Sequence, residues 1–442
     1  MGDRTFHGGV HPAEHKELSC KAPLVPYMPK GELVFLMNQH IGKPAAPIVQ
    51  KGDRVLAGQR IAEATGFVSA NIFSSVSGTV KAIEPRPTAA GPMAQAIVIT
   101  PDGENTLAEG IGTQTNYLDL TNQEILEKIK AAGIVGMGGA GFPTHVKLTV
   151  KDPNKIRYVI ANGAECEPYI TCDDQLMQTH AEEIVTGIEI ILRLFPQAHG
   201  VVCIENNKPD AIAAMKAACE GRGRISVMPM KTKYPQGGER SLISVVASRH
   251  LKLGMLPADA GCVVDNVASI RAVYRAVCLN EPLMERGVTV SGDSVKNPGN
   301  FWVKIGTSSR ELVDACGGWN EGLEPEKILS GGPMMGIPLV NLDVPICKNN
   351  NAITALSVDP VSAAPMTACL RCGRCNRVCP LGLSPQLMQV AAQHKDYERY
   401  EKRLYGLECI ACGCCTYICP AKRPLMQLFK VTKAEIMATK KR

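Results

Sequence analysis

The sequence predicts an α/β multidomain protein, with strand-rich regions on either side of an α/β centre and a helical, cysteine-rich C-terminal region. Short apolar segments bounded by glycine occur between residues 31 and 100, a pattern typical of strands and turns. Strand-like and helical patterns alternate between residues 115 and 285, as expected for an α/β layer. Nine of the 18 cysteines lie between Cys369 and Cys419. With 442 residues, 45% of them hydrophobic, the chain is long enough to form several cores.

The sequence also indicates the cellular compartment. No run of about 18 apolar residues is present, so we expect no membrane-spanning helix. The first residues, Met1 to His7, lack the apolar region of a secretory signal. We therefore expect a protein of the cytosolic side without an anchor of its own. Because thiols stay reduced there, the cysteines do not predict a disulfide framework.

The charge of the C-terminal region has two readings. From Cys369 onward there are 14 Lys and Arg residues against 5 Asp and Glu residues. Such a balance can indicate a nucleic-acid or lipid partner. Several of these cations, however, lie among the cysteines, where thiolate-bound iron–sulfur clusters would carry negative charge. We expect no nucleic-acid partner.

The N-terminal 100 residues divide into two parts. Residues 1–30, rich in Pro and His, predict an irregular arm. Residues 31–100 predict strands, and the segments 52–59 and 72–83 resemble a biotinyl/lipoyl-type barrel-sandwich hybrid. Carriers of that kind bear their cofactor on a lysine at a hairpin turn, and the corresponding turn, residues 65–71, has none. We expect a packing module that carries no cofactor.

The central and following regions are predicted from capping and strand signals. Thr121 followed by Glu124 is a capping box that starts a helix running to Ala132. Residues 157–161 and 200–204 predict buried strands of an α/β domain over 115–285. Residues 286–345 predict a β-grasp domain with one helix from Ser309 to Cys316, and residues 352–368 predict a linker.

A repeated cysteine motif gives the sharpest prediction. The spacing C-x2-C-x2-C-x3-C-P occurs twice and is that of two-cluster ferredoxins, in which the fourth cysteine serves the other cluster. Zinc sites instead use two separated ligand pairs. We expect two [4Fe–4S] clusters in residues 369–442, and an inserted helix after Ser384 favours an α-helical ferredoxin. The expected ligand sets are Cys369, Cys372, Cys375 and Cys419, and Cys409, Cys412, Cys415 and Cys379, with Cys414 a non-ligand.

Three further loops are candidates for ligand binding. The first, residues 133–144, contains Gly136, Gly138, Gly139 and Gly141 and precedes Lys147. Glycines let backbone N–H groups approach a phosphate or a flat ring. The second, residues 161–168, carries two carboxylates directly after a strand, and the third covers residues 234–240. Taken singly, each could equally be a structural or solvated turn.

Together these loops resemble the flavin- and NADH-binding subunit of respiratory NADH dehydrogenase. The resemblance implies non-covalent FMN, with NAD(H) as the substrate. It implies an FMN phosphate site at Gly136, Gly138, Gly139, Gly141 and Lys147, ribityl and ring contacts from Asn162 and Glu165, NADH contacts from Phe142, Glu167 and Glu239, and further contacts from Tyr234, Gly237, Gly238 and Asn266. Two positions depart from that family: Met137 stands in place of Arg, and Ala164 in place of Asp.

The order of parts resembles the RnfC subunits of Rnf ion-translocating ferredoxin:NAD oxidoreductases, over almost the whole chain. There the β-grasp domain is a soluble-ligand-binding (SLBB) domain. The resemblance implies an oxidoreductase/translocase subunit that exchanges electrons between NAD(H), FMN and two [4Fe–4S] clusters. It further implies peripheral attachment at the cytoplasmic face of the cell membrane, through membrane subunits and the iron–sulfur B subunit.

Two alternatives remain open from the sequence. One is a soluble flavin/iron–sulfur subunit that oxidises NADH in a hydrogenase- or formate-dehydrogenase-type assembly, which would share the central loops. The other is a cysteine-rich zinc or nucleic-acid-binding protein, which would be colourless where an iron–sulfur protein is brown.

Overall fold

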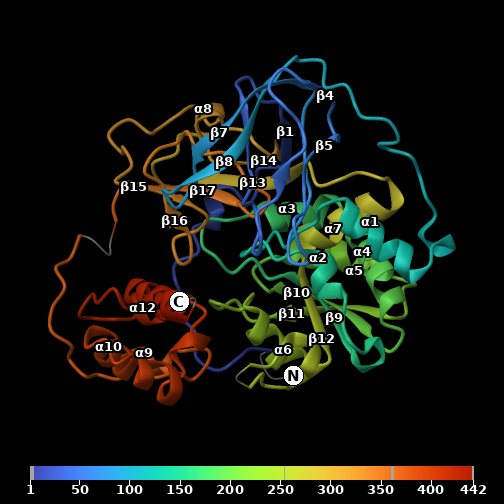
Figure 1. Cartoon of the computed structure of the whole chain (residues 1–442). Coiled ribbons are helices and arrows are strands. Elements are labelled where there is room, and N and C mark those ends of the chain that lie inside the picture. Colours follow the sequence, from blue (N-terminus) through green and yellow to red (C-terminus); the bar gives the residue numbers. More distant parts are fainter. Residues whose placement is uncertain (1–3, 253, 360–362, 441–442) are drawn as a thin grey trace.

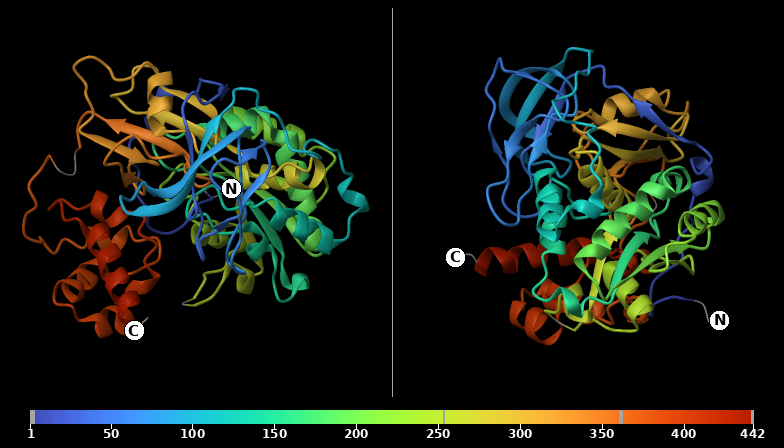
Figure 2. Two further views of the ribbon diagram at one scale, coloured as in Figure 1. Left: turned by 45° about the horizontal axis from the view of Figure 1, so that its top comes forward. Right: turned by 90° about the vertical axis from the view of Figure 1, so that its right-hand side faces the viewer.

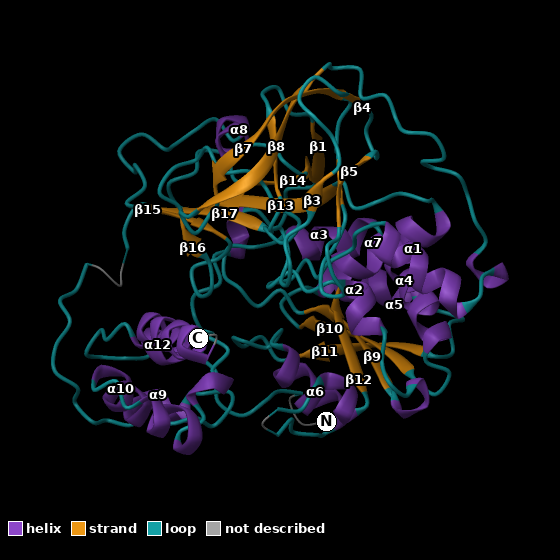
Figure 3. Ribbon diagram, viewed as in Figure 1, coloured by secondary structure: helices purple, strands orange, loops and turns teal. Residues whose placement is uncertain are grey.

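The computed structural model describes residues 4–252, 254–359 and 363–440 of the chain (Figure 1). It contains an N-terminal barrel-sandwich, a central α/β domain, a second β domain and a C-terminal helical domain. Figures 2 and 3 show the C-terminal helices as a group of their own, which contacts the rest of the chain at Tyr234 and Met334.

The barrel-sandwich domain consists of a four-stranded and a three-stranded sheet. The first has the order β2-β8-β7-β4 and the second β3-β5-β6, with antiparallel pairing throughout. Their bounds are β2 Leu33–Leu36, β3 Ala46–Pro47, β4 Arg54–Val55, β5 Arg60–Glu63, β6 Ile72–Phe73, β7 Gly78–Pro87 and β8 Met93–Pro101. Side chains such as Leu33, Phe35 and Ile61 are fully buried and belong to the same apolar cluster as the core of the α/β domain.

The α/β domain has a parallel sheet of order β11-β10-β9-β12. Both faces of the sheet are covered. Val159 and Ala161 of β9 pack with α4 and α7, while Ile160 packs on the opposite face with α6. The bounds are α1 Asn122–Ala131, α2 Thr144–Leu148, β9 Tyr158–Gly163, α3 Cys172–Thr179, α4 Ala181–Leu194, β10 His199–Glu205, α5 Pro209–Ala218, β11 Ile225–Met230, α6 Glu239–Ala247, β12 Cys262–Asn266 and α7 Val267–Cys278. The predicted capping box is present, because Thr121 and Glu124 bond reciprocally at the start of α1.

The second β domain corrects two sequence-based boundaries. Its six-stranded sheet has the order β1-β14-β13-β17-β15-β16. The bounds are β1 Leu24–Tyr27, β13 Glu285–Ser291, β14 Gly299–Lys304, α8 Ser309–Ala315, β15 Lys327–Ser330, β16 Ile337–Pro338 and β17 Ala352–Leu356. The expected irregular arm (residues 1–30) therefore supplies an edge strand, and Pro26 suits that edge because it donates no ladder hydrogen bond.

The second correction concerns the expected linker, residues 352–368. Its first five residues form β17, which pairs with β13 and β15 and is buried at every position. A short run of small and apolar residues gives no alternating pattern when both faces of a strand are covered, which explains the wrong assignment. Of the remaining residues, 360–362 lie outside the described part of the chain.

Beyond β17, every regular element in the described residues is helical. The bounds are α9 Arg374–Arg377, α10 Pro385–Gln393, a π-helical turn Arg399–Arg403, α11 Cys414–Tyr417 and α12 Leu425–Lys440. Short 3-10 turns occur at Lys16–Leu18, Tyr117–Asp119, Pro153–Lys155, Pro257–Ala260 and Gly406–Glu408. The C-terminal domain has its own apolar core around Met388, Tyr400 and Phe429. In the part of the chain described, no helix combines the length and the apolar character needed to cross a membrane.

Candidate redox site

The repeated cysteine motifs adopt matching backbone conformations. Arg371 and Ala411 occupy the left-handed region at corresponding positions, as do Gly373 and Gly413. Each motif then enters a four-residue helix, α9 or α11. Because non-glycine residues adopt this conformation only at a cost, its recurrence indicates that both loops are shaped to hold something in common.

The structure brings the eight motif cysteines together in two crossed sets. Cys379 lies with Cys409, Cys412 and Cys415 around one cavity, which we call the inner cage. Cys419 lies with Cys369, Cys372 and Cys375 around a second cavity, the outer cage. The fourth cysteine of each motif thus joins the other motif's cysteines, the arrangement that the spacing predicts.

The two cages differ in their surroundings. Three cysteines of the inner cage are buried, whereas Cys369 and Cys372 of the outer cage are exposed. Burial raises the pKa of the Cys409 thiol to about 11, so a thiolate there needs a cation beside it. Four sulfurs around one cavity are the donor set that an iron–sulfur cluster requires. Cys414 also borders the inner cage, and its Sγ donates to the carbonyl of Tyr234 at 3.9 Å.

The glycine loop lies beside the carboxyl ends of β9 and β12, where parallel sheets commonly bind ligands. A side chain at Gly138 would begin 3.1 Å from Cβ of Asn266, and one at Gly139 would meet no atom within 4 Å. Gly141 has φ +69° and faces the carbonyl of Gln39 in the barrel-sandwich domain. The loop is closed by the N–H of Gly136, which donates to the carbonyl of Phe142 at 2.8 Å.

Polar side chains join the three loops. Asn162 Nδ2 donates to the carbonyl of Gly237 at 2.9 Å, so the acidic loop contacts the third loop. Lys147 Nζ lies 3.7 Å from carboxylates of both Glu239 and Asp265. Gly238 is the N-cap residue of α6, which begins at Glu239. The structure therefore brings most of the sequence-predicted flavin residues to one place.

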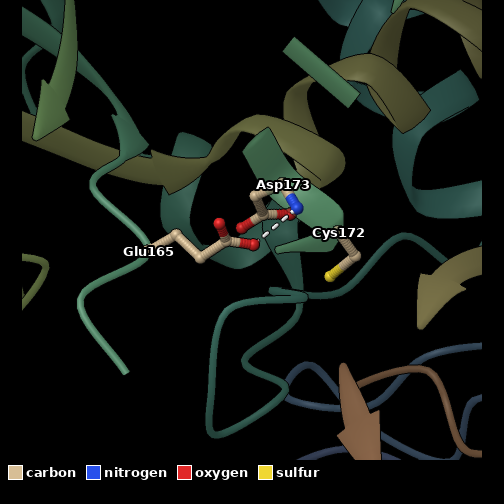
Figure 4. Close-up of side chains that lie close together, drawn as sticks. All are labelled: Glu165, Cys172 and Asp173. Carbon is tan, nitrogen blue, oxygen red and sulfur yellow. Dashed lines mark hydrogen bonds between the residues drawn. The ribbon is translucent and has the colours of Figure 1, made fainter. Parts of the chain in front are cut away.

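Glu165 lies at the centre of a buried charged cluster. Its Oε1 accepts the N–H of Asp173 at 2.7 Å, and its Oε2 lies 3.9 Å from Lys16 Nζ. Figure 4 shows Glu165 directed towards Asp173, with Cys172 beside them. Burial raises the pKa of Glu165 to about 8. A second buried cation, Lys208, donates to the carbonyl of Ala164 at 2.8 Å and so also holds the acidic loop, residues 161–168.

Two predicted residues face away from the glycine loop. The carboxylate of Glu167 accepts the backbone N–H groups of Met334 and Met335, in the second β domain, at 3.1 and 2.7 Å. The Tyr234 hydroxyl donates to the carbonyl of Cys412 at 2.8 Å, at the inner cage. At the same interface Arg240 forms an ion pair with Glu408 at 2.5 Å.

Sequence reasoning missed several charged residues of this site. Asp265 could have been found, because it precedes Asn266 at the end of a strand. No distinctive spacing marks the other three, which are Lys16 in the N-terminal arm, Lys208 just before α5 and Asp173 within α3. The two positions that depart from the NADH dehydrogenase family, Met137 and Ala164, are both buried.

A flavin-type loop cluster joined to two cysteine cages defines an electron-transfer protein, and family comparisons agree. Four family models match: the RnfC barrel sandwich hybrid domain (residues 4–104), the Nuo51 FMN-binding domain (129–275), the SLBB domain (288–338) and a 4Fe-4S dicluster domain (365–420). These matches confirm the predicted fold class and the expectation of FMN and iron–sulfur clusters.

Similar proteins of known name show the family to which the chain belongs. The chain is 44% identical over 440 residues to the C subunit of the proton-translocating ferredoxin:NAD(+) oxidoreductase complex of Clostridium ljungdahlii, covering 99% of this chain and 95% of that one. It is 40% identical over 439 residues to the C subunit of the Na(+)-translocating ferredoxin:NAD(+) oxidoreductase complex of Acetobacterium woodii, covering 99% and 98%. The chain belongs to this family, the RnfC subunits of ion-translocating oxidoreductase complexes.

One solved structure, that of an air-oxidized NAD+-reducing [NiFe]-hydrogenase, is similar at a TM-score of 0.49 and 21% identity, covering 67% of this chain and 56% of that one. The family membership confirms the favoured sequence-based prediction over both alternatives, the soluble hydrogenase-type subunit and the zinc protein.

Proposed function

We propose that this chain exchanges electrons between NAD(H) and an ion-translocating ferredoxin:NAD oxidoreductase complex, through FMN and two [4Fe–4S] clusters. A flavin, when bound, converts the two-electron chemistry of nicotinamide into the single-electron steps that a cluster accepts. The observation that carries the proposal is the contact between Tyr234 and Cys412, because it joins the flavin-type loops to the inner cage directly.

The residues fit the proposed FMN. The loop around Gly139 is open on the side where an added side chain would meet nothing, and Asn266 lies beside it at the N-terminus of α7. Both carboxylate oxygens of Asp265 are buried without a hydrogen-bond donor in the described part of the chain, although Lys147 lies 3.7 Å from one. In this proposal the glycine loop and Lys147 hold the phosphate side, while Asn162 and Glu165 face the ribityl chain and ring.

The burial of the cages supports an order of transfer. The inner cage borders Tyr234 of the flavin domain, while the outer cage has two exposed cysteines and Arg371 and Arg374 beside them. We propose that electrons pass between the flavin site, the inner cage and the outer cage, and that a partner subunit meets the outer cage. An acidic partner surface would complement its arginines.

The identity of that partner is part of the proposal. The relatives are subunits of complexes, and we propose that this chain attaches through the membrane subunits and the iron–sulfur B subunit at the cytoplasmic face of the membrane. Cross-linking from a photoreactive amino acid introduced at Arg371 in the assembled complex tests this, and a product with a subunit from the opposite face would contradict it.

Anaerobically purified protein tests the electron path. Heat-released cofactor should be FMN, and FAD or no flavin in a protein with intact clusters would refute the flavin assignment. On adding NADH, Cys369→Ser should still show reduction of the inner cluster by electron paramagnetic resonance. Cys409→Ser should leave the outer cluster oxidised, and its reduction at the wild-type rate would refute the order. Cys414→Ala is the matched control, because the proposal gives this cysteine no ligand role.

A further inference from the structure

Two buried cations lie beneath the glycine loop. Arg286 is in β13 of the second β domain and is 1% exposed, and Lys348, ahead of β17, is fully buried. Neither has a carboxylate within 4 Å among residues 4–252, 254–359 and 363–440, where other buried cations such as Lys208 have one. A charge removed from water without a counter-charge is costly, so these two need an explanation.

Both cations bond to the main chain of the glycine loop. Arg286 Nη1 donates to the carbonyl of Met137 at 3.2 Å and to that of Lys348 at 2.7 Å. Lys348 Nζ donates to the carbonyls of Gly133 at 2.7 Å and Asn71 at 2.5 Å. Arg286 and Lys348, which we call the cationic clamp, therefore bond to the middle and the start of the loop.

The loop sequence accommodates this contact at Gly133. This residue has φ +65°, and a side chain there would begin 2.3 Å from the carbonyl oxygen of Asn71 and 3.0 Å from Lys348 Nζ. Only glycine allows both the conformation and the approach. The clamp is thus built from three domains, since Asn71 belongs to the barrel-sandwich and Gly133 to the α/β domain.

The clamp brings positive charge to a loop that has no charged side chain of its own. Residues 133–144 contain no acidic or basic side chain. Carbonyl dipoles solvate the clamp but leave its net charge, and the nearby carboxylate of Asp173 is engaged by Asn266 at 2.6 Å. Charges act strongly through a low-dielectric layer, so an anion on the open face of the loop would be attracted by both.

We propose that Arg286 and Lys348 make the loop selective for a phosphorylated flavin, FMN over riboflavin. This inference rests on the proposed FMN site and assigns to the clamp the discrimination between a charged and an uncharged ligand. It acts through the loop, so both are positioning residues.

Titration of flavin-depleted protein with FMN and with riboflavin at pH 6, below the pKa of about 7 that burial gives Lys348, tests the inference when flavin fluorescence is followed. Arg286→Gln and Lys348→Gln should each reduce the ratio of FMN affinity to riboflavin affinity by about tenfold, or ~1.4 kcal/mol. Lys348→Arg should retain the ratio, because the charge stays. Lys81→Gln is the matched control, since it removes the same charge from the exposed surface of the barrel-sandwich domain.

Each result decides one point. Equal losses of FMN and riboflavin affinity in Lys348→Gln, or no loss, would overturn the inference and leave the clamp a structural device. Wild-type protein that fails to bind FMN would refute the proposed function itself. If Arg286→Gln does not fold, Lys348→Gln and Lys348→Arg still separate charge from packing.

Discussion

Replacing Tyr234 with Phe removes one hydroxyl from the contact between the flavin domain and the inner cage. The ring is 1% exposed and stays in place, so packing changes little. The hydroxyl donates to the carbonyl of Cys412 at 2.8 Å, and that carbonyl would be left without its donor. Orphaning a buried polar group costs about 1–3 kcal/mol. Other bonds to the C-terminal domain include the ion pair of Arg240 with Glu408 and the bond from the N–H of Gly9 to the carbonyl of Val378.

That cost would act mainly on docking of the C-terminal domain, because the hydroxyl bonds across the interface and not within either core. A loss of this size lowers the docking equilibrium constant by roughly 5- to 150-fold. Hydrogen exchange monitored by mass spectrometry should show faster exchange around residues 234–240 and 409–415. Stopped-flow mixing with NADH should show slower reduction of the clusters, while bleaching of the flavin keeps its wild-type rate.

Tyr397→Phe is the matched control within the same domain. Its hydroxyl donates to Glu435 at 2.7 Å, but the pair is exposed and the interface does not depend on it. We expect wild-type exchange and transfer. The reasoning would be refuted if Tyr234→Phe exchanged and transferred electrons as wild type does, or if both variants showed the same loss.

Three further predictions rest on burial and cage geometry. Cys379→Ser should alter the same cluster signal as Cys409→Ser, and pairing with Cys369→Ser in spectroscopy would show self-contained motifs instead. Burial lowers the pKa of Lys348 from 10.5 to about 7, so between these values the unfolded state binds the extra proton. The unfolding free energy of FMN-free protein, measured in denaturant, should therefore rise with pH across this window. If the same dependence on pH remained in Lys348→Met, that result would contradict the prediction. Intact mass spectrometry should show no biotinyl or lipoyl addition, and finding one would end the interpretation of the barrel-sandwich as a packing module.

The sequence predicted those parts of the molecule whose chemistry repeats or whose pattern is local. The two cysteine motifs predicted crossed sets, and Cys379 and Cys419 do lie with the other motif's cysteines. The capping box at Thr121 and the strand at β9 depend on neighbouring residues alone. The positions of the glycine loops and of Asn266 followed from a family resemblance, whereas their exact roles remain predictions.

What the sequence could not predict depends on distant contacts. β1 pairs with the distant β14, and β17 pairs with β13 as well as with the nearer β15, and their short runs carry no signal of that pairing. The cationic clamp depends on three domains meeting beneath one loop, so neither Arg286 nor Lys348 stands out by spacing. Tyr234 was assigned to the flavin site because its loop is there, while its hydroxyl reaches the inner cage.

The unequal exposure of the two cages has a consequence for energetics. The motifs share their spacing, their ligand type and even their left-handed residues, so an internal duplication alone would give two equivalent redox centres. Solvent exposure and hydrogen bonding to sulfur shift the reduction potential of a cluster with identical ligands. One copy of the motif packs against another domain, and the other lies at the surface. The two clusters would therefore have different reduction potentials although their ligands are the same. The difference in reduction potential between the two clusters would then depend on the domain interface, so a change at Tyr234, which is itself no cluster ligand, would alter it.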